Sequence, residues 1–329
     1  MVKENWTPDQ ILKLSGSYWN ACTLHAGVML DVFTVLGDES LEAENVAKRL
    51  GGDLRGVSML LNALAAMGLL IKKEGKYANT PESKTLLVKG SPKYIGYMIK
   101  HLHLLVPGWA QLAKAVTGGK PVRKRTGSEE EREIFLMGMF NLANTIAPHF
   151  AKQVDLRDRH GLLDLGGGPG TYAIHFCLAN PALKATVYDL PTTRPFALKT
   201  IEQFGLANRI DFMPGDYMED QIKGSYDVAW LSHILHGEGP EECEKIIEKT
   251  VSVMEPGGFI LIHDFILSDT LDSPLFPALF SLNMLVNTQD GQCYSESQIK
   301  GMLSKVGVKQ IRRLPFQGPN DSGIICGIV

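Results

Sequence analysis

The sequence predicts an α/β protein in two parts. The first is an all-helical half that contains a winged-helix pattern. The second is a Rossmann-like domain built on a mostly parallel, doubly wound sheet. Three observations lead to this prediction. Apolar residues recur at three- and four-residue steps before about residue 155. Short β-rich runs alternate with helical ones after about residue 160. A glycine-rich turn at 166–170 joins the first β-rich run to a helix.

Length and composition limit the classes of protein to consider. The 329 residues exceed one ordinary core and predict two domains, and the 44% hydrophobic content is that of a globular chain. A net charge of −3 argues against a nucleic-acid binder. The basic run KPVRKR at 120–125 is followed at once by the acidic SEEERE, which predicts a solvated loop.

Targeting signals and cysteine usage predict the compartment. The N-terminus lacks the apolar core of a signal peptide, and no run reaches the roughly 18 apolar residues of a membrane span. The five cysteines are dispersed without C-x-x-C spacing, which favours a reducing environment. We therefore expect a soluble, cytoplasmic protein with no membrane partner.

The first half begins with a helical pattern over 8–36. Helices at 42–50 and 54–67, followed by a hairpin around Glu74-Gly75, form the pattern of a winged helix–turn–helix. The second of these helices could bind DNA or serve as a dimerisation scaffold. Its sequence, LRGVSMLLNALAAMGLL, is apolar and carries a single arginine, which favours dimerisation.

Residues 92–155 predict further helices rich in Met, Phe and His. Such side chains are usual in a core, but they also suit the wall of a flat organic ligand. The resulting division is a dimerisation domain at 1–100, a helical linker at 101–155 that contributes to a substrate pocket, and a cofactor-binding domain at 156–329. Within the linker, the candidate ligand contacts are Met137, Phe140 and Asn141.

The second half predicts seven strands with helices between them. The β-rich runs lie at 161–166, 184–189, 209–213, 225–231, 257–263, 308–315 and 322–329. The helical segments lie at 170–179, 192–204, 240–254 and 295–305. The last two β-rich runs are too close for a crossover helix, so we expect them to pair antiparallel at the edge of the sheet.

The stretch LLDLGGGPGTYAIHF reads as strand, glycine-rich turn and helix, the arrangement that binds a ligand at the carboxyl end of a strand. Gly168, Gly170 and Ala173 fit a dinucleotide fingerprint, so this motif alone leaves the ligand open. Acidic residues at successive strand ends narrow the choice: Asp164, Asp189 and Asp216, the last followed by an apolar Met218. This much negative charge repels a pyrophosphate and attracts a sulfonium cation, which favours S-adenosylmethionine (SAM) over NAD.

Four motifs in order, DLGGGPG, VYDLP, GDYM and MEPGGFILIHDFIL, follow the winged first half. With them the chain resembles the O-methyltransferases of the caffeate and acetylserotonin type and their bacterial relatives, over nearly its whole length. The resemblance implies a class I methyltransferase fold and an obligate homodimer through the N-terminal helices, with the partner closing the substrate pocket. The candidate SAM contacts are Asp164, Gly166, Gly168, Asp189, Leu190, Gly215, Asp216, Tyr217, Met218 and Ser232.

The resemblance assigns the catalytic base to His236, in SHILHGEG, and its orienting carboxylate to Asp264, 28 residues later. An imidazole on the acceptor hydroxyl can remove its proton as the methyl group moves, a gain of about 10²- to 10⁴-fold. The chain departs from the family at three positions. Ser232 stands for a lysine, Glu238 for a tryptophan and Cys293 for a glutamate.

The histidines leave alternatives open. His236 could act as base or only as a hydrogen-bond donor to the substrate. A metal site of His233, His236 and Asp264 is disfavoured, because histidines three apart at a strand end should point their rings in different directions. By the same reasoning His233 should face away as a structural residue, and no metal is expected.

An apolar segment at 273–288 with helical spacing follows. In relatives it lines the acceptor pocket, so Phe276, Phe280, Met284 and Thr288 are candidate substrate contacts. The sequence thus predicts methyl transfer from SAM to a hydroxyl of a small, aromatic molecule. The alternatives are a C- or N-methyltransferase of the same fold and a non-catalytic SAM-binding regulator with a DNA-binding winged helix.

Overall fold

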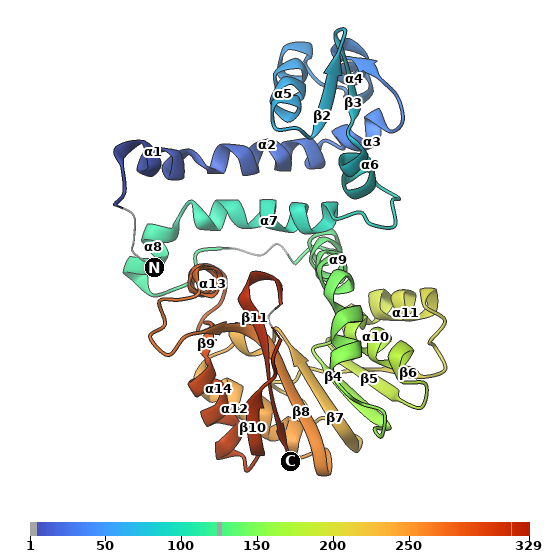
Figure 1. The fold of residues 1–329 in the computed structure, drawn as a ribbon, viewed down its shortest axis with the longest axis vertical. Coiled ribbons are helices and arrows are strands. Elements are labelled where there is room, and N and C mark those ends of the chain that lie inside the picture. Colours follow the sequence, from blue (N-terminus) through green and yellow to red (C-terminus); the bar gives the residue numbers. More distant parts are fainter. Residues whose placement is uncertain (1–4, 124–126, 317) are drawn as a thin grey trace. The chain divides into compact units, whose positions relative to one another are not determined.

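The computed structural model describes residues 5–123, 127–316 and 318–329. The chain divides into two compact units, Met1–Leu104 and Leu105–Val329. The boundary falls inside helix α7 (Gly96–Trp109). Figure 1 shows the order of the elements along the chain within each unit.

The first unit combines helices with a three-stranded sheet of order β1-β3-β2. Its elements are α1 (Pro8–Gly16), α2 (Tyr18–Met29), α3 (Val32–Leu36), β1 (Leu41–Glu42), α4 (Ala43–Leu50), α5 (Leu54–Ala66), β2 (Leu70–Lys73), β3 (Lys76–Asn79) and α6 (Pro81–Leu87). The helices α4 and α5 and the hairpin lie where the sequence predicts them. The unit is not all-helical, because β1 joins that hairpin: Leu41 pairs with Tyr77.

The helical pattern over 8–36 is divided into three helices. Asp31, between α2 and α3, takes a left-handed backbone with φ 56°, which a continuous helix cannot contain. A capping box between Thr7 and Gln10 starts α1. None of the residues of α1 is buried. The result is an exposed apolar surface, formed by Trp6, Ile11, Leu12, Leu14, Tyr18 and Trp19.

The second unit carries the large sheet and the helices that cover it. Its elements after α7 are α8 (Leu112–Gly118), α9 (Glu129–Gln153), β4 (Gly161–Leu165), α10 (Thr171–Ala179), β5 (Lys184–Asp189), α11 (Arg194–Gln203), β6 (Ile210–Pro214), β7 (Tyr226–Ser232), α12 (Pro240–Val251), β8 (Met254–Leu267), α13 (Leu275–Asn287), β9 (Tyr294–Ser295), α14 (Glu296–Lys305), β10 (Lys309–Arg313) and β11 (Ser322–Ile328). Short 3₁₀ turns lie at Pro191–Thr193, Leu235–Gly237 and Pro319–Asp321.

The strand order β10-β11-β8-β7-β4-β5-β6 contains the seven predicted strands, and the short β9 adds a parallel pair to β8. β4 to β8 are parallel, whereas β11 and β10 run antiparallel at one edge, as the sequence predicts. The chain runs outward from β4 to β6 and then returns to β7 beside β4. Loops that leave neighbouring strands in opposite directions open a crevice, so the carboxyl ends of β4 and β7 are the favoured ligand site.

The two faces of the sheet are covered by different helices (Figure 1). Along β7, Val228 and Trp230 point to one core, which includes residues of α9, α10 and α11. Ala229 and Leu231 point to the other, which includes residues of α12 and α14. This alternation buries both faces of each central strand and accounts for their nearly continuous apolar sequences.

The predicted solvated loop at 120–125 differs in part from the structure. Lys124 and Arg125 lie outside the described residues. Arg123 is not solvated: its side chain is 9% exposed and forms an ion pair of 2.5 Å with Glu131. It also donates to Asn287 Oδ1 (3.3 Å). A buried guanidinium requires such partners, and only the folded chain brings them to it.

Among the described residues, no helix combines the length and the apolar character that a membrane crossing would require.

Candidate active site

The glycine-rich turn follows β4 at the switch point of the sheet. Gly166, Gly168 and Gly170 have φ of 62°, 54° and 76°, in the left-handed region that favours glycine. A Cβ on Gly166 would lie 2.2 Å from Ile234 Cδ1, so the loop passes close to the segment after β7. The backbone N–H of Gly166 donates to the Tyr188 carbonyl at the end of β5 (2.7 Å). The turn is therefore held between two neighbouring strand ends with its backbone uncovered by side chains of its own.

The carboxylate of Asp189, at the end of β5, faces this turn. Its Oδ2 accepts from Gly168 N–H (2.8 Å), and its Oδ1 accepts from Leu190 N–H (2.7 Å) and the Thr193 hydroxyl (2.9 Å). Burial raises the pKa of Asp189, and these three donors work against that rise. The predicted ribose-binding acid is thus fixed against the glycine turn, while Leu190 is 47% exposed beside it.

Hydrogen bonds within the protein hold the segment after β6 in place. Asp216 Oδ1 accepts from Met218 N–H (2.8 Å), and the Lys249 ammonium donates to the carbonyls of Tyr217 (3.0 Å) and Met218 (2.6 Å). A Cβ on Gly166 would be 3.7 Å from Tyr217 Cε1, so the tyrosine ring packs beside the glycine turn. The structure thus brings these predicted cofactor residues to one rim of the sheet, at the carboxyl ends of β4, β5 and β6.

Glu238 also reaches this rim, at the position where the family resemblance expects tryptophan. Its Oε1 accepts from the Tyr217 hydroxyl (3.3 Å). Burial raises the pKa of Glu238, and the nearby Glu242, Asp216 and Asp290 raise it further. The aromatic ring that the resemblance expects at this position is therefore replaced by the carboxyl group of Glu238, which has other acidic residues near it.

Asp164 and Ser232, two predicted cofactor contacts, have partners inside the protein. Asp164 is 1% exposed and its Oδ2 accepts from Ala173 N–H (3.2 Å), while its Oδ1 has no hydrogen-bond partner. Burial raises the pKa of Asp164 to about 7. Ser232 Oγ lies 2.8 Å from Nδ1 of the fully buried His263. The side chains of both residues therefore contact groups of the protein interior, behind the strand ends that would face a cofactor.

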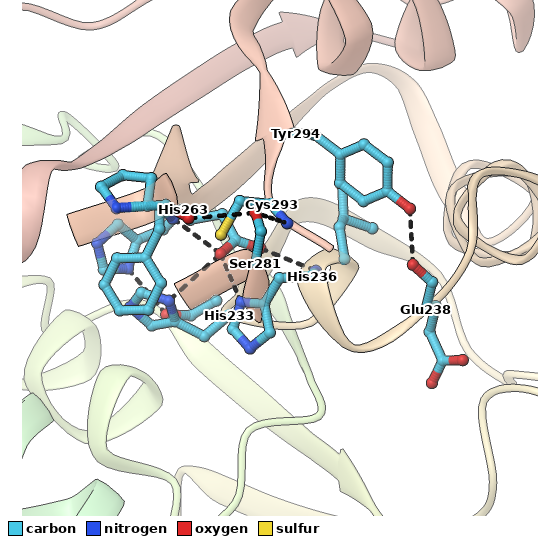
Figure 2. A network of polar contacts seen from close by, with 12 residues as sticks. His233, His236, Glu238, His263, Ser281, Cys293 and Tyr294 are labelled. Atoms are coloured by element: carbon cyan, nitrogen blue, oxygen red, sulfur yellow. Dashed lines mark hydrogen bonds and ion pairs between the residues drawn. The ribbon is translucent and has the colours of Figure 1, made fainter. Parts of the chain in front are cut away.

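His236, in the 3₁₀ turn that follows β7, meets Asp264 of β8. Figure 2 shows His233 and His236 within this network of polar contacts. His236 Nδ1 lies 2.6 Å from Asp264 Oδ1, and the His236 backbone N–H donates to Oδ2 (3.3 Å). Asp264 is 2% exposed. Burial would raise its pKa, but His236 and His233 outweigh this and hold it below its usual value. An ionised carboxylate can only accept, so His236 carries a proton on Nδ1, and its Nε2 is the unprotonated nitrogen of the neutral ring.

The expectation that His233 faces away is wrong. His233 Nδ1 lies 3.5 Å from the same Asp264 Oδ1. Its backbone has φ 58°, and this left-handed turn breaks the side-to-side alternation on which the expectation relied. The rings of His233 and His236 are 5.7 Å apart, and with Asp264 they offer three possible ligand atoms within 4.8 Å of one another. The geometric argument against a metal is therefore also wrong.

Aromatic rings pack around His236. Phe265 stacks near the imidazole at 5.9 Å and an angle of 18°, and Phe280 meets it edge-on at 4.9 Å. Phe276 packs against both phenylalanines, at 4.9 Å and 5.8 Å. The sequence predicts Phe276 and Phe280 as substrate contacts but not Phe265, whose only sequence signal is its position next to Asp264.

The predicted contacts on α9 differ in their surroundings. The Phe140 ring meets the ring of Phe204, at the end of α11, at 6.5 Å. Met137 is half-buried, and Asn141 has a buried Oδ1 without a hydrogen-bond partner. Leu136, a residue of α9 that was not predicted, lies near the glycine turn: a Cβ on Gly168 would be 3.9 Å from its Cδ2.

The end of α13 and the segment after it support the His236 loop. Met284 is buried, and its carbonyl accepts from the Thr288 hydroxyl (2.8 Å). Gly291 packs so closely that a Cβ would be 2.6 Å from the His236 carbonyl. The thiol of Cys293 is buried, and burial raises its pKa to about 12. It remains neutral and cannot supply the negative charge of the glutamate that the resemblance expects there.

The residues present fit SAM. The glycine turn leaves its backbone open, Asp189 presents a fixed carboxylate beside it, and the acids near Tyr217 suit a cation. The orphaned Asp164 Oδ1 adds an unused acceptor behind the turn. A pyrophosphate would meet like charge at each of these groups.

Comparison with known proteins agrees with this geometry. Residues 109–309 match the model of the O-methyltransferase domain, and residues 12–89 match the O-methyltransferase dimerisation domain. A similar protein is 3-hydroxy-5-methyl-1-naphthoate 3-O-methyltransferase of Streptomyces sahachiroi, 31% identical over 98% of this chain and 95% of its own. An N,N-dimethyltransferase of Streptomyces rimosus is 27% identical over 92% of both chains.

A solved structure is also similar over the whole chain. Human N-acetylserotonin methyltransferase in complex with SAM superposes with a TM-score of 0.87, with 25% identity, covering 100% of this chain and 99% of that one. The sheet order and the whole-chain match show a class I methyltransferase fold with an N-terminal helical dimerisation domain, as the sequence predicts.

Proposed function

This chain belongs to the O-methyltransferase family, and from that premise we propose that it transfers a methyl group from SAM to a hydroxyl of a small aromatic molecule, with His236 as general base. The observation that carries the proposal is the 2.6 Å contact between His236 Nδ1 and Asp264 Oδ1 beside the glycine turn. In the neutral ring, a proton held on Nδ1 by Asp264 would leave Nε2 as the nitrogen that can accept a proton.

The cofactor side of the site would be held by the glycine turn and the acids at the strand ends. When bound, SAM supplies an activated methyl group on a sulfonium. Gly166 and Gly168 admit the ligand to the backbone, and Asp189 would accept from the ribose hydroxyls. Leu190, Gly215, Asp216, Tyr217 and Met218 would surround the adenine. Asp164 and Ser232 would act from behind the rim.

On the acceptor side, His236 would take the hydroxyl proton on Nε2. A phenol has a pKa near 10 and is mostly neutral at pH 7, so removal of its proton makes the oxygen a far better nucleophile. The ring then becomes an imidazolium while Asp264 retains its hydrogen bond to Nδ1. The buried carboxylate stabilises this new positive charge and fixes the ring orientation.

The rings around His236 support an aromatic acceptor. Phe265, Phe276 and Phe280 form a continuous aromatic wall whose faces and edges suit a flat molecule. The name of the naphthoate methyltransferase relative agrees with such an acceptor. The further acceptor contacts in this proposal are Met137, Phe140, Asn141, Met284 and Thr288.

A homodimer through the first unit is part of the proposal. The exposed apolar surface at α1 and α2 would be unusual on a monomer, and its residues from Leu12 onward lie within the segment that matches the dimerisation domain. α5 also keeps Met59 exposed at 55%, an apolar surface that suits a protein partner better than DNA. The division into 1–100, 101–155 and 156–329 stays a part of this proposal.

A second candidate is transfer to nitrogen. The N,N-dimethyltransferase relative supports it, as does the neutral Cys293 in place of a family glutamate. An amine that is already neutral needs no strong base, so the two candidates differ in their dependence on the Nε2 nitrogen of His236.

The substitution His236→Asn tests the proposal. The asparagine Nδ2 occupies the position of the histidine Nδ1 and can still donate to Asp264, but the base nitrogen is gone. We expect kcat for phenolic acceptors to fall by about 10²- to 10⁴-fold, with the Kd of SAM unchanged in calorimetry. Full transfer to a phenol by a variant that binds SAM normally would refute the base assignment. Retained transfer to an amine alone would favour the second candidate.

A further inference from the structure

Asp264 has a second histidine beside it. His233 Nδ1 and His236 Nδ1 approach the same oxygen, Asp264 Oδ1, at 3.5 Å and 2.6 Å. Figure 2 labels the two histidines, which lie side by side. We propose that His233 is a positioning residue for methyl transfer: its Nδ1–H directs the Asp264 carboxylate toward His236 and so fixes the proton on His236 Nδ1. This inference rests on the proposed role of His236 as base.

The backbone of His233 is held in a conformation that costs energy. A non-glycine residue in the left-handed region is disfavoured by about 1–2 kcal/mol. His233 has φ 58° directly after the last residue of β7, and its N–H donates to the His263 carbonyl (2.8 Å). Without this turn, strand alternation would direct the ring elsewhere. Strain of this kind is kept where the resulting side-chain position has a use.

Packing fixes the His233 ring against its neighbours. The ring lies 4.4 Å from the Phe265 ring and 4.5 Å from the His263 ring. Its side chain is 23% exposed, yet its Nδ1 is buried and has no hydrogen-bond partner within ordinary distance among the described residues. The contact with Asp264 Oδ1 exceeds an ordinary N–H···O bond by a few tenths of an ångström. Such contacts often shorten when the substrates fill the site.

The needs of Asp264 explain why a second donor would matter. Its Oδ1 accepts from Phe265 N–H (2.8 Å) and from His236, and it is almost fully buried. A buried anion requires several donors to remain ionised and in place. The carboxylate must stay charged while His236 becomes an imidazolium. A donor on the flank of Oδ1 restrains its rotation away from His236.

Two substitutions distinguish the contribution of the His233 side-chain donor from that of its left-handed backbone. His233→Asn places an amide Nδ2–H₂ where the histidine Nδ1–H stands, and asparagine tolerates the left-handed region. His233→Gly accepts that backbone without strain but removes the donor. We expect the glycine variant to lose roughly tenfold in kcat, because a misplaced catalytic group can cost up to about 100-fold. The KM of the acceptor and the Kd of SAM should stay unchanged, and the asparagine variant should keep most of the wild-type kcat.

A spectroscopic readout accompanies the kinetics. The proton in the short His236–Asp264 hydrogen bond should give a low-field resonance in proton spectra of the histidine-labelled full-length protein. His236→Asn identifies the resonance by removing it. We expect the signal to persist in His233→Asn and to broaden or move upfield in His233→Gly, because the glycine variant leaves the carboxylate freer.

Each result decides a separate point. Wild-type kcat and an unmoved resonance in His233→Gly would overturn the inference, as would an asparagine variant that fails as badly as the glycine variant while remaining folded. If His236→Asn retains full activity, the base proposal fails by itself. The resonance in His233→Gly then still shows whether His233 positions Asp264.

Discussion

The charge of Asp264 should contribute much of the catalytic effect, and Asp264→Asn isolates that charge. The amide oxygen can replace Oδ1 and accept from His236 Nδ1 and Phe265 N–H, so the ring keeps its orientation. The amide NH₂ would then face the His236 backbone N–H at the 3.3 Å position, a weak repulsion. What is lost is the anion opposite an imidazolium that forms during transfer.

The expected size follows from Coulomb's law. Two unit charges about 4 Å apart interact by about 4 kcal/mol at an effective dielectric constant of about 20. Because each factor of ten in rate is about 1.4 kcal/mol, kcat should fall by about 10³-fold. The assay is single-turnover transfer from labelled SAM to a phenolic acceptor, with SAM affinity measured separately so that a binding defect is not mistaken for a chemical one.

A matched control lies at the other end of β7. Asp227 lies near the start of β7, whereas His233 and His236 follow its end, and its carboxylate accepts from the backbone N–H groups of His160 (2.8 Å) and Gly161 (2.9 Å). Asp227→Asn removes a carboxylate from the same strand and should leave kcat within about twofold, as expected of a change that spares transition-state contacts. If Asp264→Asn also stays within threefold while it binds SAM, the carboxylate does not stabilise the imidazolium and the reasoning is wrong.

Three further predictions concern stability and the acceptor. Burial raises the pKa of Asp164 to about 7 from 3.8, so its contribution to stability is full below about pH 4 and is lost as pH rises to about 7. Asp164→Asn should remove up to about 4 kcal/mol of that pH dependence in urea unfolding, and an unchanged slope would contradict the raised pKa. Gly215→Ala places a Cβ 2.2 Å from the hydroxyl of the fully buried Tyr188, so it should lower the free energy of unfolding by about 1–3 kcal/mol. Its control is Gly301→Ala, at a helical position with open space for a Cβ, which should raise the free energy of unfolding slightly. Phe280→Ala should raise the KM of an aromatic acceptor about tenfold and leave the Kd of SAM alone; equal weakening of both would place Phe280 elsewhere.

The sequence contained enough to predict the second unit in detail. Strands such as 184–189 and 225–231 are short runs rich in β-branched, aromatic and other apolar residues, and a parallel sheet buried on both faces needs such runs. The edge hairpin followed from loop length alone. The glycine turn could also be predicted from the sequence, because a left-handed backbone at three positions within five residues leaves few choices other than glycine.

The first unit was predicted less fully. Apolar spacing predicts where its helices lie. It does not predict the break at Asp31, because aspartate tolerates a left-handed backbone but also occurs in many other conformations. The addition of β1 to the hairpin pairs residues that are far apart in the sequence, such as Leu41 with Tyr77. A two-residue strand carries no periodicity from which to predict it.

For the site, the sequence by itself determined which chemistry was available: a glycine turn, acids at successive strand ends, and a histidine after β7 with a carboxylate 28 residues later. Only the tertiary structure decided that Asp264 has two imidazoles against one oxygen, that Phe265 stacks near His236, and that Leu136 borders the glycine turn. The physical reason is that strand spacing predicts side-chain direction only while the backbone stays extended. One left-handed residue, His233, reverses that direction, and burial and non-local packing determine where such a turn is tolerated.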